Sequence, residues 1–489
     1  MNEDYKNRQI IPRWYPFDYA CRLGEISSGL EIRPYVWTPL SYKEKQVQWQ
    51  TNKDLSSALD FVGSALMAND FENVEAVEAS GLILTEEAKI SNLARKLASR
   101  FLRQPEPEPS FDLSIKRGHI KKIAILKKQV RAYPYNAISW ADMAFHYVVL
   151  GQYDKADQCI SIALNLSSEN RFIIRAAARH SLHMDDPERA LFILRQSDVI
   201  EHDPWLIASE ISISEAFHKR SKHIKFAEQM LFASDISPKN LSELFGTIAT
   251  LEVKNGALKR AKKLFRNALT DPNENTVAQA EWIAPQIGLS IELSQNVEAS
   301  FEADARRCFR AEDYKRSLEF TLKWLRYQPF SARPAVHATY VAAVCLNDHL
   351  ECLRIVEREA KELMHKDFSL KNNYIVSLAS LDRVEEAEKL LLTIDVSKLS
   401  EKHQATYCAT KGLVRFRGRE YDAGRRLYGE AIQKFRDLEE ERGIALATYF
   451  WIREESRIKN DVKKMIPKVI QLAKKLNIHE LFQVERFLA

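Results

Sequence analysis

Glycine, proline and long apolar runs are scarce in this sequence. Of its 489 residues, only 14 are glycine and 16 are proline, whereas Ala, Leu, Glu, Lys and Arg are abundant. This composition favours helices over sheets. No apolar run reaches the about 18 residues that a membrane-spanning helix needs, and the N-terminus lacks the basic and then apolar layout of a signal peptide. We therefore expect an all-α protein that stays in the cytoplasm.

Motifs for catalysis or metal binding are also missing. The sequence has no glycine-rich phosphate loop, no H-E-x-x-H and no G-x-S-x-G. Its six cysteines include no C-x-x-C pair, which is typical of buried, reduced thiols. Cys345, His349 and Cys352 lie close in sequence, but Cys352 occupies a predicted helix crossing, so packing is favoured over zinc binding. We expect no enzyme activity, no cofactor and no metal.

Neither sign of charge dominates. The formal net charge is +5, and charged residues make up 28% of the chain. This mild balance is not typical of a dedicated nucleic-acid binder, although local basic clusters remain possible contacts. Hydrophobic residues make up 45%, which indicates a folded protein rather than a disordered one.

The sequence is periodic. Pro204, Pro238 and Pro272 are spaced by 34 residues, as are Ala156 and Ala190. Two residue types that share one period indicate internal repeats. Each proline follows a helical apolar pattern and is expected to end a unit.

Each repeated unit is predicted to consist of two antiparallel helices joined by a short turn. A small residue is expected where the two helices cross, because small side chains let the helix axes approach. One unit cannot bury its apolar surface alone, so the units should stack on one another. The small residues at the predicted crossings are Ala156, Ala190, Ala227, Ala261, Ser317, Cys352, Ala387 and Gly424.

The units resemble the tetratricopeptide repeat family in length and in their order of Trp or Leu, Gly or Ala, Tyr, Ala, Phe, Ala and Pro. The resemblance implies a right-handed α-solenoid of about eight helix pairs within residues 137–440. An irregular helical insert is expected at 276–297, and capping helices at 441–489. A generic α-solenoid with another pair geometry is the alternative. The units that match best are 137–170, 242–275 and 405–440.

The N-terminal region combines aromatic residues with prolines. Proline at that density prevents long helices, so residues 1–53 are predicted to form an extended arm. This arm is too apolar to stay free in solvent. It is expected either to pack on the solenoid as an N-terminal cap or to dock a partner through aromatic anchors. The candidate anchors are Trp14, Tyr15, Phe17 and Trp37.

Three segments separate this arm from the repeats. Residues 54–103 are predicted to form a small helical unit, and the alternating Pro and Glu at 104–110 indicate a stiff linker. Residues 111–136 are predicted to form an amphipathic helix with a basic face. That face is either solvated or a contact for phosphate, nucleic acid or an acidic partner, and its residues are Lys116, Arg117, Lys121, Lys122, Lys127 and Lys128.

The resemblance also implies a concave groove that is lined by the first helices and binds a peptide or a partner helix. Several units place cations there, which suits an acidic segment or a C-terminal carboxylate. The alternative is that these cations pair with Glu or Asp of the same groove. Arg415, Arg417 and Arg419 also surround a turn where phosphate could be contacted. The candidate groove residues are Arg175, Arg179, Lys219, Arg220, Arg306, Arg310, Phe416 and Arg417.

These observations predict a non-catalytic adaptor that binds one or more proteins through its groove and its N-terminal arm. One alternative is a helical-repeat RNA-binding protein that uses the basic segments for contacts to the RNA backbone. Another alternative, by analogy with stand-alone repeat proteins, is a regulatory subunit that restrains an effector enzyme such as a toxin or a phage-defence nuclease.

Overall fold

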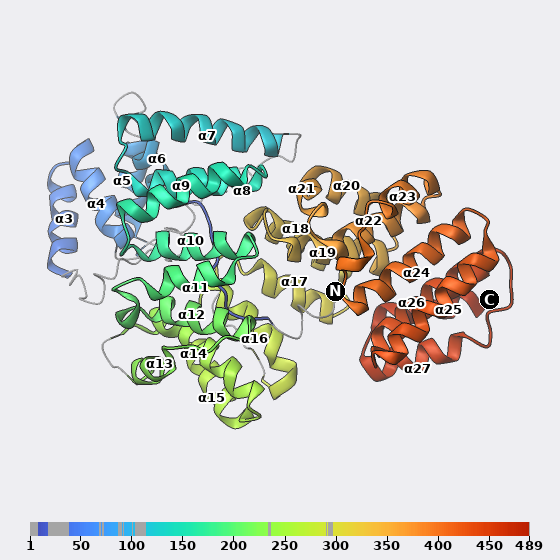
Figure 1. Cartoon of the computed structure of the whole chain (residues 1–489). Coiled ribbons are helices and arrows are strands. Elements are labelled where there is room, and N and C mark those ends of the chain that lie inside the picture. The colour runs from blue at the N-terminus through green and yellow to red at the C-terminus, as the bar shows by residue number, and fades with distance from the viewer. Residues whose placement is uncertain are drawn as a thin grey trace. The chain divides into compact units, whose positions relative to one another are not determined.

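The computed structural model describes residues 8–17, 39–67, 70, 73–86, 90, 92–99, 101–102, 114–232, 236–289, 291 and 297–488. The chain forms two compact units, one of residues 1–29 with 115–489 and the other of residues 30–114. Every regular element in the described ranges is a helix (Figure 1), so the predicted all-α fold is confirmed. None of these helices combines the length and the apolar character that crossing a membrane requires.

The described residues of the smaller unit form four helices around an apolar core. Trp49, Phe61 and Ile83 are among the residues buried there. The helices are α3 (Pro39–Thr51), α4 (Leu55–Met67), α5 (Val74–Thr85) and α6 (Asn92–Ser99).

Helix α3 corrects the prediction that residues 1–53 are extended throughout. The helix begins at Pro39, and proline is tolerated at the first position of a helix because the N–H that it lacks would have no partner there. Proline density therefore set the start of α3 rather than preventing a helix. Trp37 and the predicted linker at 104–110 lie outside the described residues.

The larger unit contains the predicted helix pairs. Eight pairs are present among its described residues, at the places where repeat units were expected. They are α8 (Ala137–Val149) with α9 (Tyr153–Leu166), α10 (Arg171–His183) with α11 (Pro187–Arg195), α12 (Pro204–Ala216) with α13 (Ile224–Met230), α14 (Pro238–Lys254) with α15 (Leu258–Ala268), α17 (Phe301–Arg310) with α18 (Tyr314–Tyr327), α19 (Ala332–Tyr340) and its π-helical continuation η4 (Val341–Cys345) with α20 (His349–Glu359), α22 (Phe368–Ser380) with α23 (Val384–Leu391), and α24 (Glu401–Arg417) with α25 (Tyr421–Asp437).

Other helices flank or connect these pairs. Helix α7 (Ser114–Ala132) precedes them, within the segment predicted as a basic helix. Helix α16 (Glu274–Ile287) follows the fourth pair, where the irregular insert was expected. The remaining helices are η3 (Ile200–His202), α21 (Lys361–Met364), η5 (Val396–Lys398), α26 (Glu441–Arg457), α27 (Ile466–Leu476) and η6 (His479–Leu488).

The small residues lie at helix crossings, as predicted. Seven of them are 0% exposed, namely Ala156, Ala190, Ala227, Ala261, Ser317, Cys352 and Ala387. At the eighth crossing, a Cβ atom on Gly424 would lie 2.3 Å from the ring of Phe416, so no larger residue fits without a shift. Small size at one position per unit thus sets the distance between paired helices.

Two of the three repeated prolines begin helices instead of ending units. Pro204 and Pro238 are the first residues of α12 and α14. The side chains of Asp203 and Ser237 cap these helices by accepting backbone N–H bonds from their first turns. A capping residue followed by proline is a favourable helix start, which explains why the expected unit ends were shifted.

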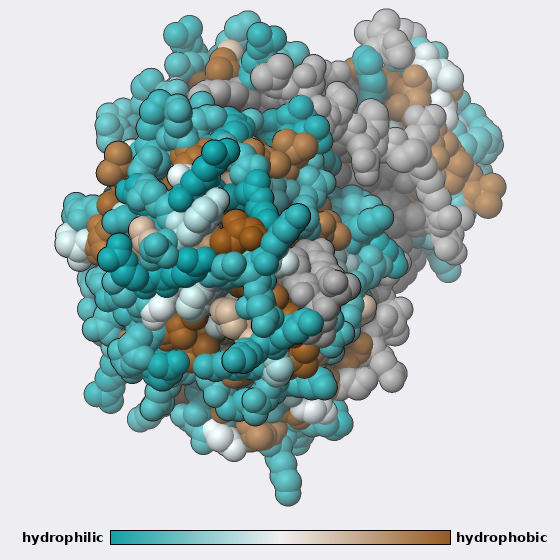
Figure 2. Space-filling model, turned by 90° about the vertical axis from the view of Figure 1, so that its right-hand side faces the viewer, coloured by the Kyte–Doolittle hydropathy of each residue, from teal (hydrophilic) through white to brown (hydrophobic). Residues whose placement is uncertain are grey.

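Figure 2 shows the face that lies on the right of Figure 1 as mostly hydrophilic, with its hydrophobic residues in small separate groups. The larger apolar surfaces of the repeat array are used between helices.

Candidate partner-binding site

Residues 8–17, called the arm from here on, lie against the first helices of the repeat array. Trp14 is 1% exposed, and its ring centroid lies 5.5 Å from that of Phe145 and 5.7 Å from that of Phe330. At the end of the arm, the backbone N–H of Phe17 donates to a carboxylate of α8 at 2.8 Å. The arm thus packs on the solenoid, and it does so along inner helices instead of capping an end. We call the faces of α8, α10, α14, α16 and α17 around the arm the filled groove.

Side-chain amides of α16 hold the arm by its main chain. The Nδ2 of Asn275 donates to the carbonyl of Ile11 at 3.1 Å, and the Nε2 of Gln279 donates to the carbonyl of Arg8 at 2.9 Å. Every peptide offers such carbonyls, so these bonds position a chain without selecting its sequence.

Charge also holds the arm, mainly through the buried carboxylate of Glu302. Glu302 accepts from the Nε of Arg8 at 2.8 Å and from the Nη2 of Arg13 at 2.6 Å. Arg306 lies 3.3 Å from the same carboxylate, and Arg333 lies 3.8 Å from it. Burial opposes the ionised form, but these arginines outweigh burial and hold the pKa of Glu302 well below its usual range. The filled groove is therefore acidic and its occupant is basic.

The predicted anchors of the arm are occupied within the chain. Trp14 and Tyr15 are buried, and the Tyr15 hydroxyl donates to Oε1 of Glu274 at 2.9 Å. The ring of Phe17 lies 5.6 Å from that of Phe172. Docking of a separate partner by these residues stays a prediction.

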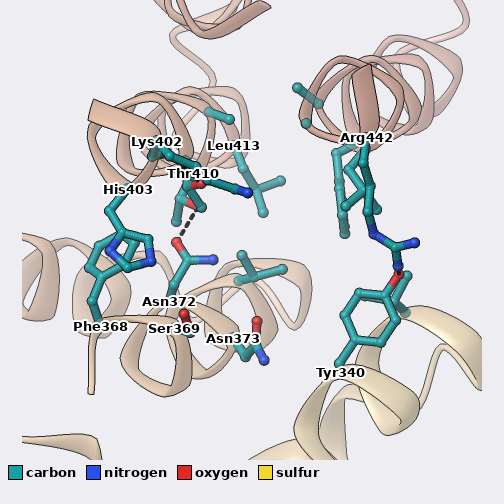
Figure 3. Close-up of a pocket in the computed structure, with 18 of the residues that line it drawn as sticks. Tyr340, Phe368, Ser369, Asn372, Asn373, Lys402, His403, Thr410, Leu413 and Arg442 are labelled. Atoms are coloured by element: carbon teal, nitrogen blue, oxygen red, sulfur yellow. Dashed lines mark hydrogen bonds between the residues drawn. The ribbon is translucent and has the colours of Figure 1, made fainter. Parts of the chain in front are cut away.

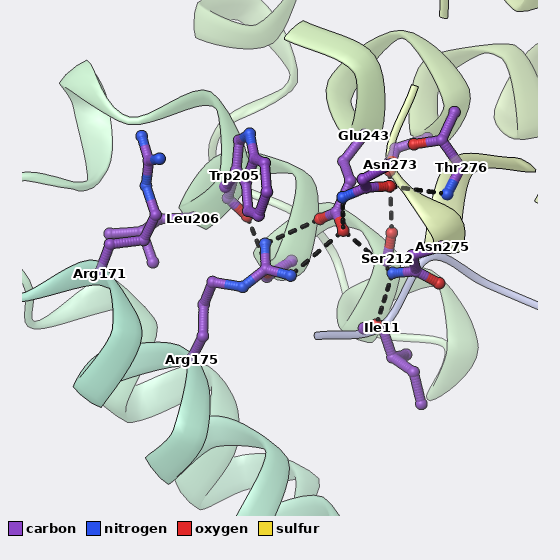
Figure 4. Close-up of polar contacts among 12 residues, drawn as sticks. Ile11, Arg171, Arg175, Trp205, Leu206, Ser212, Glu243, Asn273, Asn275 and Thr276 are labelled. Carbon is purple, nitrogen blue, oxygen red and sulfur yellow. Dashed lines mark hydrogen bonds and ion pairs between the residues drawn. The ribbon is translucent and has the colours of Figure 1, made fainter. Parts of the chain in front are cut away.

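The predicted groove cation Arg175 binds an acid of its own chain (Figure 4). Its guanidinium donates to both oxygens of Glu243, at 2.8 and 3.2 Å, and lies 4.6 Å from the centroid of the Trp205 ring. Asn273 and Asn275 also donate to Glu243. Burial acts to raise the pKa of Glu243, but Arg175 and the amides outweigh it, so the pKa is lowered. Arg175 therefore stabilises the wall behind the arm.

Most of the other predicted groove cations also have acidic partners. The pairs are Arg306 with Glu302 at 3.3 Å, Arg310 with Glu281, and Lys219 with Glu188 at 2.9 Å. Phe416 is buried, and Arg220 is exposed. Arg179 has no acidic partner among the described residues, and its guanidinium lies 5.1 Å from the ring of Phe330. Contact of these residues with a partner protein stays a prediction.

Arg417 lines a cavity of about 310 Å³ together with Arg453 and Arg457, where α22, α24 and α26 end. Glu454 accepts from Arg417 at 2.5 Å, and Asp382 accepts from Arg457 at 2.7 Å. These carboxylates and the negative ends of three helix dipoles offset the arginines. The predicted phosphate contact around Arg417 stays untested.

Helix α7 exposes the basic face that its sequence predicts. Its apolar residues Ile123, Leu126 and Val130 are buried. The side chain of Lys116 lies outside the description of burial, and the exposed predicted residues are Arg117, Lys121, Lys122, Lys127 and Lys128.

A second groove holds no segment of the described residues. It is a cavity of about 160 Å³ on α19, η4, α22, α24 and α26, called the open groove from here on (Figure 3). Its apolar walls include Val336, Val376, Leu413, Leu446 and Phe450. These residues were not predicted from the sequence, because charge marked the predicted groove positions and this groove is mainly apolar.

The polar groups of the open groove are amides, hydroxyls and cations. The Thr410 hydroxyl donates to Oδ1 of Asn372 at 2.6 Å, and among the described residues nothing accepts from the Nδ2 of Asn372. Lys402 and Arg442 also line the cavity, and each is held by a carboxylate that does not line it. No carboxylate belongs to the described lining, so the open groove is mainly apolar, with two cations at its edge that pair outward with Glu440 and Glu480.

Comparison with known proteins finds neither a matching family model nor a matching curated sequence. Among solved structures, yeast Tom70 is 12% identical with a TM-score of 0.33, over 88% of this chain and 95% of that chain. The Cut9–Hcn1 hetero-tetramer of the APC/C is 13% identical with a TM-score of 0.32, over 97% and 98%. An IFIT1 monomeric mutant with m7Gppp-AAAA is 13% identical with a TM-score of 0.29, over 99% and 98%. At these TM-scores the likeness carries no argument, and the helical-repeat fold rests on the helix pairs themselves.

Proposed function

We propose that this chain is a non-catalytic helical-repeat scaffold whose open groove binds a non-helical segment of a partner protein. The observation that carries this proposal is the filled groove, where the first helices of the same array already hold a non-helical segment. There, amides bind main-chain carbonyls and the aromatic rings of the arm fill the space between helices. The open groove offers the same kinds of contact and lies on equivalent helices.

Charge defines the partner segment more closely. The filled groove presents Glu274 and Glu302 and takes up an arm with two arginines. The open groove presents Lys402 and Arg442 beside apolar walls. Its occupant therefore carries apolar side chains and at least one carboxylate, and Asn372 takes the role that Asn275 has toward the arm.

A matched pair of substitutions tests this proposal. Asn372→Asp keeps the size of the side chain but places a carboxylate in the open groove, whereas Gln433→Glu makes the same chemical change on the exposed face of α25. Peptides are first selected from a random 12-residue display library on the wild-type chain. Repulsion of an acidic peptide by the new carboxylate, with loss of an amide donor, should weaken binding by about tenfold or more, and Gln433→Glu should leave the affinity unchanged.

Fluorescence anisotropy measures both affinities, with a synthetic peptide of residues 18–38 as a competitor. Selected peptides that bind Asn372→Asp as tightly as wild type would contradict the proposal. Stronger binding by the 18–38 peptide than by any selected peptide would instead assign the groove to a segment of this chain.

The exposed cations of α7 favour a second candidate function, contact with nucleic-acid phosphates. Five basic side chains of this helix are exposed, and none of them has an ion pair among the described residues. Binding of poly(U) RNA that weakens with salt and falls on Lys121→Glu with Lys122→Glu would support it. RNA binding that is indifferent to both salt and these substitutions would exclude α7 as the contact.

A further inference from the structure

A cluster of cations and rings lies where the first helix pairs meet the segment before α22. The Nζ of Lys366 lies 3.6 Å from the centroid of the Tyr153 ring. That ring lies 5.5 Å from the ring of His183, which lies 5.6 Å from the ring of Phe330. Arg179 lies 5.1 Å from Phe330 on the same side of α10 as His183, one turn away. These contacts join segments that are more than 200 residues apart in the sequence, from Tyr153 to Lys366.

Among the described residues, the positive charge at this place is only partly balanced by carboxylates. Burial and then the cations Arg333 and Arg13 lower the pKa of Arg179 to about 10, and no carboxylate offsets them. Arg333 lies 3.8 Å from Glu302, but Glu302 already pairs more closely with Arg8 and Arg13, at 2.8 and 2.6 Å. Arg179 is half-buried and has no acidic partner among the described residues.

His183 adds an unused polar atom to the same place. Its Nε2 is buried and has no hydrogen-bond partner among the described residues. Burial, and then Arg179 and Lys366, lower the pKa of His183 to about 3, so the ring is neutral. Buried polar atoms are usually hydrogen-bonded. An unpaired cation and an unpaired ring nitrogen on neighbouring turns of α10 point to a group from outside the chain.

We infer that Arg179, His183, Arg333 and Lys366, called the basic site, bind a phosphoryl group of a small ligand. Three cations suit a dianion better than the single charge of a carboxylate, and a guanidinium matches phosphoryl oxygens in geometry. The arm restricts the size of the ligand, because the ring of Trp14 packs directly against the ring of Phe330. The basic site shares no residue with the open groove, so this inference goes beyond the proposed function and stands or falls separately.

Thermal unfolding of the full chain tests the basic site, with inorganic phosphate, pyrophosphate and acetate as probes at constant ionic strength. A ligand that binds only the folded state raises Tm as its concentration rises. Phosphate and pyrophosphate should raise Tm in this way, and acetate should not. Arg179→Met keeps an unbranched side chain against Phe330 but removes the charge. It should abolish the phosphate-dependent rise while leaving Tm without phosphate equal to that of wild type or higher, since an unpaired charge has been removed.

Two further variants keep the test decisive. Lys366→Gln changes an exposed side chain, so it should fold normally and weaken phosphate binding by about tenfold. Lys475→Gln is the matched control, because Lys475 is an exposed lysine on α27 paired with Glu441, and it should bind phosphate as wild type does. The inference would be overturned if phosphate raised Tm no more than acetate, or if Lys475→Gln lost the rise as fully as Arg179→Met. A short single-stranded RNA that raises Tm where inorganic phosphate does not would overturn the assignment to a small ligand.

Discussion

The filled groove and the open groove are built from equivalent helices of one repeat array, but they differ in charge and in occupancy. The filled groove is acidic at Glu274 and Glu302 and holds the basic arm of its own chain. The open groove has cations, amides and apolar walls, with no carboxylate among its described lining residues. The comparison shows that the first helices of this array hold a non-helical segment in one groove, and that the charged residues lining the two grooves differ.

Removing the main anchor of the arm should have the largest effect. Trp14→Ala would leave a cavity between Phe145 and Phe330, and such a change typically costs about 3–5 kcal/mol of unfolding free energy. Urea denaturation measures this loss. A loss below about 1 kcal/mol would mean that the arm only rests on the array, and the contrast between the grooves would no longer hold.

Overpacking at a helix crossing should lower the free energy of unfolding by a similar amount near either groove, because both grooves belong to one repeat array. Ala261→Leu in α15 and Gly424→Ala in α25 both add atoms where helices touch. Overpacking of this kind costs about 1–3 kcal/mol. Denaturation of the two variants, beside Gly429→Ala as a control with nothing within 4 Å of the added Cβ, checks this expectation. Tolerance at Ala261 alone would show that the first half is packed more loosely.

Acid should destabilise the helices around the filled groove more than the helices around the open groove. Burial lowers the pKa of His119 and His180 to about 4 and that of His146 to about 3, and all three lie on α7, α8 or α10. Below about pH 6.5 these histidines become protonated in the unfolded chain, whereas they stay neutral in the folded chain. Each such group therefore removes about 1.4 kcal/mol of stability per pH unit from pH 6.5 down to its folded pKa.

Hydrogen exchange at pH 7 and pH 5, corrected for the intrinsic rate, follows this loss in each half. Among the described residues of the second half, His337 and His349 have similarly lowered pKa values. Exchange in α8 and α10 should rise more than in α22 and α24. An equal rise in both halves would contradict the assignment of acid sensitivity to the helices around the arm.

The smallest effect is expected for a ring of the open groove. Phe368 is only half-buried and its ring lies tilted against that of His403, with 4.8 Å between the centroids, so Phe368→Ala should cost less than about 1 kcal/mol of stability. The same variant should clearly weaken peptide binding, because Phe368 lines the open groove and its ring would contact the peptide. Denaturation and anisotropy on one preparation measure both. A large loss of stability would mean that the ring serves the fold and not the ligand.

The helix pairs could be predicted from the sequence because their signal is local and periodic. Small residues such as Ala261 recur at one spacing, and their burial follows from that spacing. The place of the arm could not be predicted in this way, because Arg8 and Glu302 are 294 residues apart and no local pattern links them.

The acidic partners of some groove cations could have been predicted from the repeat length. Arg175 and Glu243 are 68 residues apart, which is twice the repeat length, and Arg417 and Glu454 are 37 residues apart. A search for acids two repeats away would have found the pair of Arg175 and Glu243, but the pair of Arg417 and Glu454 departs from the 34-residue period. The open groove has no such signal, because its apolar residues resemble those that pack helices together.

Hydrogen exchange of the wild-type chain, with and without a library-selected peptide, tests the central claim most directly. The claim is that the filled groove is closed by the arm and that the open groove receives the partner. The account predicts that the peptide slows exchange in α22, α24 and α26 and leaves α14 and α16 unchanged. Slower exchange in α14 and α16, together with faster exchange in the arm, would show that the partner displaces the arm and would contradict the account.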